Sequence, residues 1–161
     1  GVAGRMDLFF GEHAKRIDKK GRVSVPSDFR TALAEAQADA VIVLPEPKQP
    51  FLRGMPPAEF QDILRQLRVA HGRFSAQRTA ASRKLFSKAL KLQFDGEGRI
   101  ILPKHFLDYA QIDGELVFAG AGDHFQIWQP DQLAAHDRDD AAMADDTIEA
   151  LEALPPEGLG L

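Results

Sequence analysis

The chain of 161 residues contains no cysteine, one tryptophan and one tyrosine. Without cysteine it can form neither a disulfide framework nor a thiolate metal site, and this absence is typical of the reducing cytoplasm. No apolar run approaches the roughly 18 residues that a membrane-spanning helix needs. The first ten residues, GVAGRMDLFF, lack the long apolar stretch of a secretory signal. The sequence therefore predicts a cytoplasmic globular protein without a membrane partner.

The net charge of −4 conceals an uneven distribution of charge along the chain. Residues 131–161 hold nine acidic residues and one basic residue, whereas residues 1–130 hold 19 Lys and Arg against 15 Asp and Glu. The basic residues concentrate at 11–30 and 61–91, and such clusters favour an anionic partner. The acidic end has two interpretations. It is either a solvated, flexible tail with at most a short helix, or an intramolecular mimic of nucleic acid that competes for the basic surface.

Two decapeptides of the chain share one pattern. IDKKGRVSVP at residues 17–26 and FDGEGRIILP at residues 94–103 both read apolar, Asp, two residues, Gly, Arg, three small or apolar residues, Pro. Further matches keep the same order, first at an offset of 77 and, after a three-residue deletion, at an offset of 74. Ordered self-similarity of this kind indicates an internal duplication.

Each copy predicts the same order of short elements: a strand, a tight turn, a short strand closed by proline, a short helix and a two-stranded hairpin. The turns DKKG and DGEG each place glycine where a positive φ is needed. In the short helices we expect Phe29 and Leu33 of the first copy, and Phe106 and Tyr109 of the second, to face the core.

The segment between the two copies predicts two helices. In the first, apolar residues recur at i, i+3, i+4 and i+7, namely at Phe60, Ile63, Leu64 and Leu67. The second begins at the expected N-cap residue Ser75. A helical link predicts that the copies pack as one body. We therefore expect a first repeat at 7–56, linking helices at 57–84, a second repeat at 85–135 and an acidic, flexible tail at 136–161.

Little in the sequence supports catalysis. The five histidines are scattered, and no two of them have metal-ligand spacing with a carboxylate partner. There is no nucleophile elbow, phosphate-binding loop or dinucleotide fingerprint. The DGEG turn has too few oxygen ligands for a calcium loop. We predict that the protein is not an enzyme and has no catalytic residue, cofactor, metal or small-molecule substrate.

Five cations lie within the ten residues HAKRIDKKGR, on a predicted strand, its turn and the next strand: Lys15, Arg16, Lys19, Lys20 and Arg22. A two-stranded ribbon of this kind fits the major groove of double-stranded DNA. The lysines are suited to neutralising phosphates, and the planar guanidinium of Arg22 is suited to a bidentate contact with guanine. These residues form the candidate DNA-binding site.

A purely structural role is the alternative for Arg22. The Asp-x-x-x-Arg spacing allows Arg22 to pair with Asp18 across the turn, and Asp95 and Arg99 repeat this spacing. A structural pair does not explain the two lysines between Asp18 and Arg22. The second turn has lost these lysines and carries Glu97. If DNA is bound, we therefore expect the first turn to dominate.

On these residues the chain resembles the MraZ family, bacterial transcriptional regulators built from two tandem AbrB-type repeats. The similarity lies in GEHAKRIDKKGRVSVPSDFR, in SRKLFSKALKLQFDGEGRIILPKHFLDYAQI and in the closing hairpins, and it covers roughly residues 7 to 135. It implies an α+β, β-rich fold in which two swapped-hairpin repeats form one pseudo-symmetric β barrel with flanking helices. The acidic tail lies outside the resemblance.

The resemblance also assigns motif residues to both repeats. The aspartates, glycines and arginines of the motif are Asp18, Gly21 and Arg22 and, in the second repeat, Asp95, Gly98 and Arg99. The position before the motif glycine, usually basic in the family, is Lys20 in the first repeat and Glu97 in the second. This departure weakens the expectation that Arg99 contacts DNA.

The implied function is that of a nucleoid-associated regulator. The family binds short G-rich direct repeats in the promoter of its own division and cell-wall operon, as a homo-oligomeric ring. We expect the apolar hairpins around Phe51, Phe125 and Trp128 to support assembly into such a closed oligomer. Two alternatives remain: a ring-forming scaffold or RNA or protein interaction module without sequence-specific DNA binding, and an unrecognised enzyme.

Overall fold

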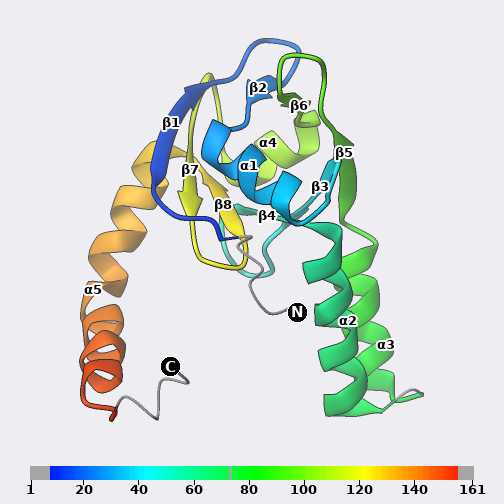
Figure 1. Cartoon of the computed structure of the whole chain (residues 1–161), viewed down its shortest axis with the longest axis vertical. Coiled ribbons are helices and arrows are strands. Elements are labelled where there is room, and N and C mark those ends of the chain that lie inside the picture. The colour runs from blue at the N-terminus through cyan, green and yellow to red at the C-terminus, as the bar shows by residue number, and fades with distance from the viewer. Residues whose placement is uncertain (1–7, 73, 156–161) are drawn as a thin grey trace. The chain divides into compact units, whose positions relative to one another are not determined.

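A computed structural model describes residues 8–72 and 74–155 (Figure 1). These residues fall into two units, of which the first ends at Gln129 and the second begins at Pro130. The expected start of the first repeat at residue 7 and the end of the expected tail at residues 156–161 lie outside the described residues. No helix in the described part of the chain is long and apolar enough to cross a membrane.

The first unit contains the elements of both repeats in the predicted order. The first repeat comprises β1 (Glu12–Arg16), β2 (Arg22–Ser24), α1 (Ser27–Glu35), β3 (Ala40–Pro45) and β4 (Leu52–Met55). The second comprises β5 (Leu90–Gln93), β6 (Arg99–Ile101), α4 (Lys104–Ala110), β7 (Glu115–Gly120) and β8 (Phe125–Trp128). Between them lie α2 (Pro57–His71) and α3 (Ala76–Phe86).

The strands of the two repeats interleave in one sheet. Its order is β1-β7-β8-β4-β3-β5, and all neighbouring strands are antiparallel. Exchanging the repeats, β1 for β5, β7 for β3 and β8 for β4, reproduces this order in reverse, so the sheet has pseudo-two-fold symmetry. The interleaving confirms that the two copies pack as one body. β1 and β5 are the outer strands, and no pairing among the described strands closes the sheet into a barrel.

The basic turn does not connect two strands of one ribbon, so the prediction of a ribbon built from one repeat is wrong. β1 pairs with β7, whereas β2 pairs with β6 of the other repeat in a separate two-stranded ribbon. The backbone N–H of Leu102 donates to the carbonyl of Gly21 at 2.8 Å, and that of Val25 donates to the carbonyl of Gly98 at 3.2 Å. A ribbon this short needs a packed face to be stable, and pairing across the repeats places that face on the common core.

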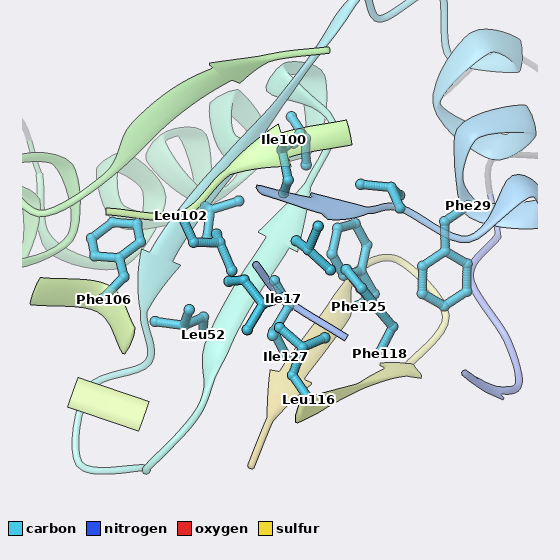
Figure 2. Close-up of a cluster of buried hydrophobic side chains, with 14 of the residues drawn as sticks. Ile17, Phe29, Leu52, Ile100, Leu102, Phe106, Leu116, Phe118, Phe125 and Ile127 are labelled. Atoms are coloured by element: carbon cyan, nitrogen blue, oxygen red, sulfur yellow. The ribbon is translucent and has the colours of Figure 1, made fainter. Parts of the chain in front are cut away.

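The core lies beneath this ribbon (Figure 2). Val23 and Ile100, which are opposite each other in the ribbon, are 1% and 0% exposed. The buried ring of Phe29 on α1 lies 5.1 Å from that of Phe125 on β8 and 6.2 Å from that of Phe118 on β7. Burial of each such side chain contributes about 1.5–3 kcal/mol. The shared core therefore fixes the ribbon, and with it both motif turns, on the unit.

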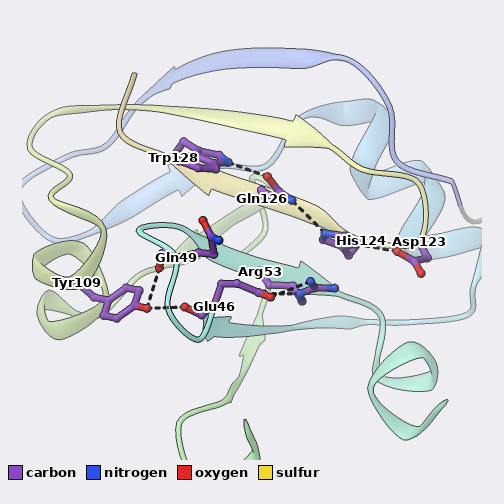
Figure 3. Close-up of polar contacts among 8 residues, drawn as sticks. All are labelled: Glu46, Gln49, Arg53, Tyr109, Asp123, His124, Gln126 and Trp128. Atoms are coloured by element: carbon purple, nitrogen blue, oxygen red, sulfur yellow. Dashed lines mark hydrogen bonds and ion pairs between the residues drawn. The ribbon is translucent and has the colours of Figure 1, made fainter. Parts of the chain in front are cut away.

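Tyr109 on α4 does not face the core, and the prediction that it does is wrong. Its residue is 40% exposed, whereas Phe106 and Ala110 are fully buried. The Tyr109 hydroxyl is instead hydrogen-bonded to the backbone carbonyls of Glu46 and Gln49 (Figure 3). Phe106 and Ala110 have i, i+4 spacing and share one helix face, so Tyr109 falls beside that face, over the turn between β3 and β4.

The helical link between the repeats is confirmed. Phe60 of α2 is 9% exposed and stacks on Phe86 of α3 with ring centroids 4.2 Å apart. It belongs to a second apolar cluster that also contains Ile42, Leu44 and Met55. The Ser75 hydroxyl accepts from the backbone N–H of Arg78 at 3.0 Å, which confirms the predicted N-cap of α3.

The aromatic residues of the closing hairpins are buried inside the first unit. Phe51, Phe125 and Trp128 are 7%, 0% and 4% exposed. The rings of Phe51 and Trp128 stack 4.7 Å apart, because β4 and β8 pair at the centre of the sheet. These side chains therefore stabilise the fold of the unit. They offer no exposed surface for the expected assembly.

The acidic end forms a longer helix than the short one expected. α5 (Pro130–Glu152) has 23 residues, and its described side chains beyond His136 are exposed. Alanine, which occurs six times in α5, has the highest intrinsic helix propensity, and the sequence prediction gave it too little weight against the six aspartates. The structure thus confirms solvent exposure of this segment and corrects its secondary structure.

Candidate nucleic-acid interface

The motif carboxylate of the first repeat organises its turn through three hydrogen bonds. Oδ1 of Asp18 accepts from the backbone N–H groups of Lys20 and Arg22, both at 2.9 Å. Oδ2 accepts from Nε of Arg22 at 2.6 Å. The bond to Lys20 is that of an Asx-turn, and Gly21 completes the turn with φ at +83°. The ion pair therefore holds the Arg22 guanidinium in a defined place beside the turn.

The second repeat builds the same turn. Oδ1 of Asp95 accepts from the backbone N–H groups of Glu97 and Arg99 at 2.9 Å, and Oδ2 accepts from Nε of Arg99 at 2.7 Å. Gly98 has φ at +75°. The Asp–Arg pairing, the structural alternative for Arg22, thus exists in both repeats.

These bonds favour the charged form of both carboxyl groups. The backbone N–H of Arg22, and then its guanidinium and the N–H of Lys20, lower the pKa of Asp18. The corresponding bonds from Arg99 and Glu97 lower the pKa of Asp95. The bond that Arg99 donates to Asp95 raises the pKa of Arg99, and the charge of Asp18 adds a smaller increase. The two turns are therefore near enough to interact electrostatically.

Both motif arginines lie on the outward face of the β2–β6 ribbon. Side chains alternate between the two faces of a strand. Because Val23 and Ile100 face the core, their neighbours face outward: Arg22 lies opposite Ile101, and Ser24 lies opposite Arg99. In Figure 1 the two turns rise next to each other at the end of the unit that carries this ribbon. The structure thus brings the predicted Arg22 and Arg99 onto one surface.

The two turns differ in charge. Lys19 and Lys20 are exposed at the tip of the first turn, and the Arg22 side chain is 36% exposed with Asp18 as its ion-pair partner in the described chain. The second turn has Gly96 and Glu97 at the corresponding positions. Oε2 of Glu97 lies 3.6 Å from Nη1 of Arg99. Nη1 of Arg99 therefore faces a second carboxylate, whereas the terminal nitrogens of Arg22 have no ion-pair partner in the part of the chain that the structure describes.

The two remaining predicted cations lie on opposite faces of β1. The Arg16 side chain is 89% exposed, and it lies 3.9 Å from Glu115, its cross-strand neighbour on β7. Lys15 lies on the same face as the buried Ile17 and is half-buried. Arg16 is thus the more accessible of the two.

Arg30 also belongs to this surface, although the sequence did not predict it. Its Nε donates to the carbonyl of Val25 at 3.2 Å. Its guanidinium lies against the second turn, so that a Cβ on Gly98 would be 2.7 Å from Nη1 of Arg30. The repeat offset of 77 places Leu107 at the equivalent position of the second copy. Because this contact joins α1 to the other repeat, no local sequence pattern signals it.

Comparison with known proteins identifies the family. The profile described as "MraZ protein, putative antitoxin-like" matches residues 8–84 and 85–150. The chain belongs to the MraZ family. A transcriptional regulator MraZ from Parvibaculum lavamentivorans is 37% identical over 131 residues, which cover 81% of each chain. One from Rickettsia akari is 32% identical over 131 residues, 81% of this chain and 87% of the relative. One from Rickettsia rickettsii is 35% identical over 125 residues, 78% and 83% of the two chains.

The two MraZ matches correspond to the structural repeats. The first includes the strands of the first repeat, α2 and α3 up to Lys84, and the second begins at residue 85, in the last turn of α3. The second match extends to residue 150, within α5. The family similarity thus reaches further into the acidic end than the boundary near residue 135 at which the sequence resemblance was placed.

Proposed function

We propose that this MraZ protein is a transcriptional regulator that binds double-stranded DNA sequence-specifically, chiefly through its first motif turn. The observation that supports this proposal most strongly is the accumulation of cations there: the exposed Arg16, Lys19 and Lys20 and the partly exposed Arg22. The relatives named as transcriptional regulators support the same class of function.

The geometry of the turn suits two different roles for its cations, phosphate neutralisation and base recognition. Lys19 and Lys20 are flexible point charges that neutralise phosphates without reading sequence. Arg22 is held through Nε by Asp18, so its terminal nitrogens lose little further freedom when they bind a planar partner. A bidentate contact between arginine and guanine contributes about 1–3 kcal/mol of discrimination. Arg22 is therefore the proposed base-reading residue.

We further propose that several copies form a closed ring in the cytoplasm and bind direct repeats in the promoter of the protein's own division and cell-wall operon, at the nucleoid. A single turn makes few phosphate contacts, so its affinity is low and falls steeply with salt. Identical turns on a ring raise the effective concentration at each successive DNA repeat. Direct repeats suit cyclic symmetry, since each step along the DNA corresponds to one rotation between neighbouring subunits.

Fluorescence anisotropy with the duplex upstream of the protein's own gene tests this function. The matched competitors are a shuffled duplex of the same composition and an RNA hairpin of the same length. We expect selective, salt-dependent binding to the upstream duplex. Equal affinity for the shuffled duplex would contradict sequence-specific regulation and favour a scaffold, and preference for the hairpin would favour an RNA-binding module.

A further inference from the structure

A hollow of about 380 Å³ lies on the first unit, lined by residues outside the candidate nucleic-acid interface. Three segments form it: the turn between β3 and β4, the C-terminal end of α3 and the short helix α4. The first segment belongs to the first repeat and the last to the second, so the hollow depends on their interleaving. Its volume falls within the range of about 300–1,000 Å³ that is typical of small-molecule sites.

Positive charge surrounds this hollow without an acidic counterpart. Lys48, Lys84 and Lys88 line it together with His105, and no carboxylate of the described residues does. None of the three lysines has an ion-pair partner among the described residues. Three ammonium groups around one concavity repel one another and raise the local positive potential. A bound anion would relieve this repulsion.

The nearest carboxylates in sequence are engaged elsewhere. Glu46 accepts two hydrogen bonds from Arg53, at 2.6 and 3.0 Å (Figure 3). On α4, Asp108 pairs with Lys104 at 3.0 Å. Each of these two acids is thus paired with its own cation, and neither is paired with a lysine of the hollow.

The wall of the hollow is well defined. The Tyr109 hydroxyl is hydrogen-bonded to two carbonyls of the β3–β4 turn, which fastens this turn to α4 (Figure 3). Burial raises the pKa of Tyr109, so the hydroxyl remains a hydrogen-bond donor at neutral pH. In the same turn Lys48 has φ at +62°, a left-handed conformation that few residues with a Cβ adopt. The turn therefore presents a lysine where glycine would be less strained.

We propose that this hollow binds a small organic phosphate with a planar, largely apolar body, of about the size of a mononucleotide. The lysines match the phosphate groups, because ammonium–phosphate hydrogen bonds are charge-assisted. The rings of Tyr109 and His105 and the two prolines of the turn, Pro45 and Pro47, provide an apolar lining for the planar body. The ligand is bound rather than chemically changed, and this proposal does not depend on the DNA-binding function.

Isothermal titration calorimetry of the full chain with ADP tests the proposal, with inorganic pyrophosphate and adenosine as partial probes. We expect ADP to bind more tightly than either partial probe. The variant Lys84→Gln/Lys88→Gln, which keeps most of both aliphatic stems, should weaken ADP binding at least tenfold. The matched control Arg68→Gln/Lys91→Gln removes the same charge outside the hollow and should change ADP binding less than twofold.

Three outcomes would overturn the proposal. The first is an absence of ADP and pyrophosphate binding at millimolar concentration. The second is an equal loss in both double variants, which would indicate unspecific attraction to the unit. The third is unchanged ADP binding by Lys84→Gln/Lys88→Gln. A lower melting temperature of this variant would then assign the lysines to the α3 terminus, and weaker DNA binding would assign them to DNA. In that last case the proposed DNA-binding function still stands.

Discussion

The two motif turns of this MraZ protein have the same geometry and different charge. In each, an aspartate accepts two backbone N–H bonds and the Nε–H bond of an arginine four residues later, and a glycine closes the turn at positive φ. The first turn places two lysines inside this frame, and the second places Gly96 and Glu97 there. The comparison indicates that each aspartate organises its turn through the backbone bonds it accepts, and we propose that the flanking charges decide what the turn binds.

Duplication explains why both turns retain the frame. β2 and β6 pair only with each other among the described strands, and each turn is anchored to the other repeat by a backbone hydrogen bond from Leu102 or Val25. A damaged turn would therefore disturb the ribbon that both repeats share. The flanking positions are exposed and make no such contact, so they are open to divergence.

The largest difference is expected between Arg22→Ala and Arg99→Ala in DNA affinity. Arg22→Ala should weaken binding at least tenfold, since each lost base contact removes about 1–3 kcal/mol and the loss multiplies over a multivalent assembly. Arg99→Ala should weaken it less than threefold, because Glu97 already faces the Arg99 guanidinium. Anisotropy titrations with the upstream duplex measure both.

Melting curves and light scattering are the controls for these two variants. Each arginine is partly exposed and paired at the surface, so melting temperature and oligomer size should change little and by similar amounts. Equal loss of DNA binding without loss of stability would show that both turns contact DNA, contrary to the asymmetry proposed here.

Alanine substitutions at the glycines of the two turns should lower the stability of the protein by different amounts. A Cβ on Gly21 would lie 2.5 Å from the backbone carbonyl oxygen of Leu102, whereas a Cβ on Gly98 would meet the mobile end of the Arg30 side chain at 2.7 Å. Both alanine variants adopt a strained φ, but only Gly21→Ala also displaces backbone. We expect Gly21→Ala to lower the free energy of unfolding by about 2–3 kcal/mol and Gly98→Ala by about 1 kcal/mol.

Urea unfolding of both variants measures this difference, and Gly96→Ala is the matched control, since a Cβ there meets nothing within 4 Å. The control should stay close to the parent chain. An equal loss in Gly21→Ala and Gly98→Ala would show that the positive φ alone determines the cost.

We expect the two motif aspartates to make the stability of the protein depend modestly on pH. The pKa of Asp18 and that of Asp95 are lower in the folded chain than the ordinary value. Their contribution to stability is therefore complete above the unfolded pKa of about 3.9 and is lost as the pH falls through the folded pKa. Thermal melts between pH 2 and 6 should show a smaller acid-induced decrease for Asp18→Asn/Asp95→Asn than for the parent chain. Identical pH profiles would exclude this contribution.

The smallest effect on DNA affinity is expected from truncation of the acidic end. If its negative charge competes for the basic turn, a chain truncated after Asp131 should bind DNA a few-fold more tightly at low salt. Screening shortens the range of this repulsion to about 8 Å at physiological ionic strength, so the gain should vanish as salt is raised. Unchanged affinity at low salt would leave α5 without a role in DNA binding.

Local features of the structure were predictable from the sequence. The glycine turns and the N-cap at Ser75 depend on neighbours within a few residues, and both are confirmed. The apolar face of α2 is confirmed for Phe60 and Ile63, whereas Leu64 and Leu67 do not belong to the apolar cluster. The Asp18–Arg22 pair was also foreseen, as the rival of a binding role. The structure shows that the pair exists and leaves the terminal nitrogens of Arg22 without an ion-pair partner in the described chain.

Features that depend on contacts between the repeats were not predictable. Pairing of β2 with β6, the approach of Arg30 to Gly98 and the burial of Phe51 against Trp128 all join residues far apart in the sequence. The orientation of Tyr109 depends on the distant β3–β4 turn in the same way. A periodic pattern identifies the buried face of an element and does not identify the element that covers it.

The salt dependence of DNA affinity tests the central claim most directly. Each cation that neutralises a phosphate contributes about 0.9 to the slope of log K against log salt. Lys19→Gln/Lys20→Gln should therefore reduce the magnitude of this slope by about 1.8 for each DNA-bound turn, whereas Lys91→Gln/Lys104→Gln should leave it nearly unchanged. A first-turn variant with the slope of the parent chain, or with that of the control, would contradict the assignment of DNA binding to the charge of the first turn.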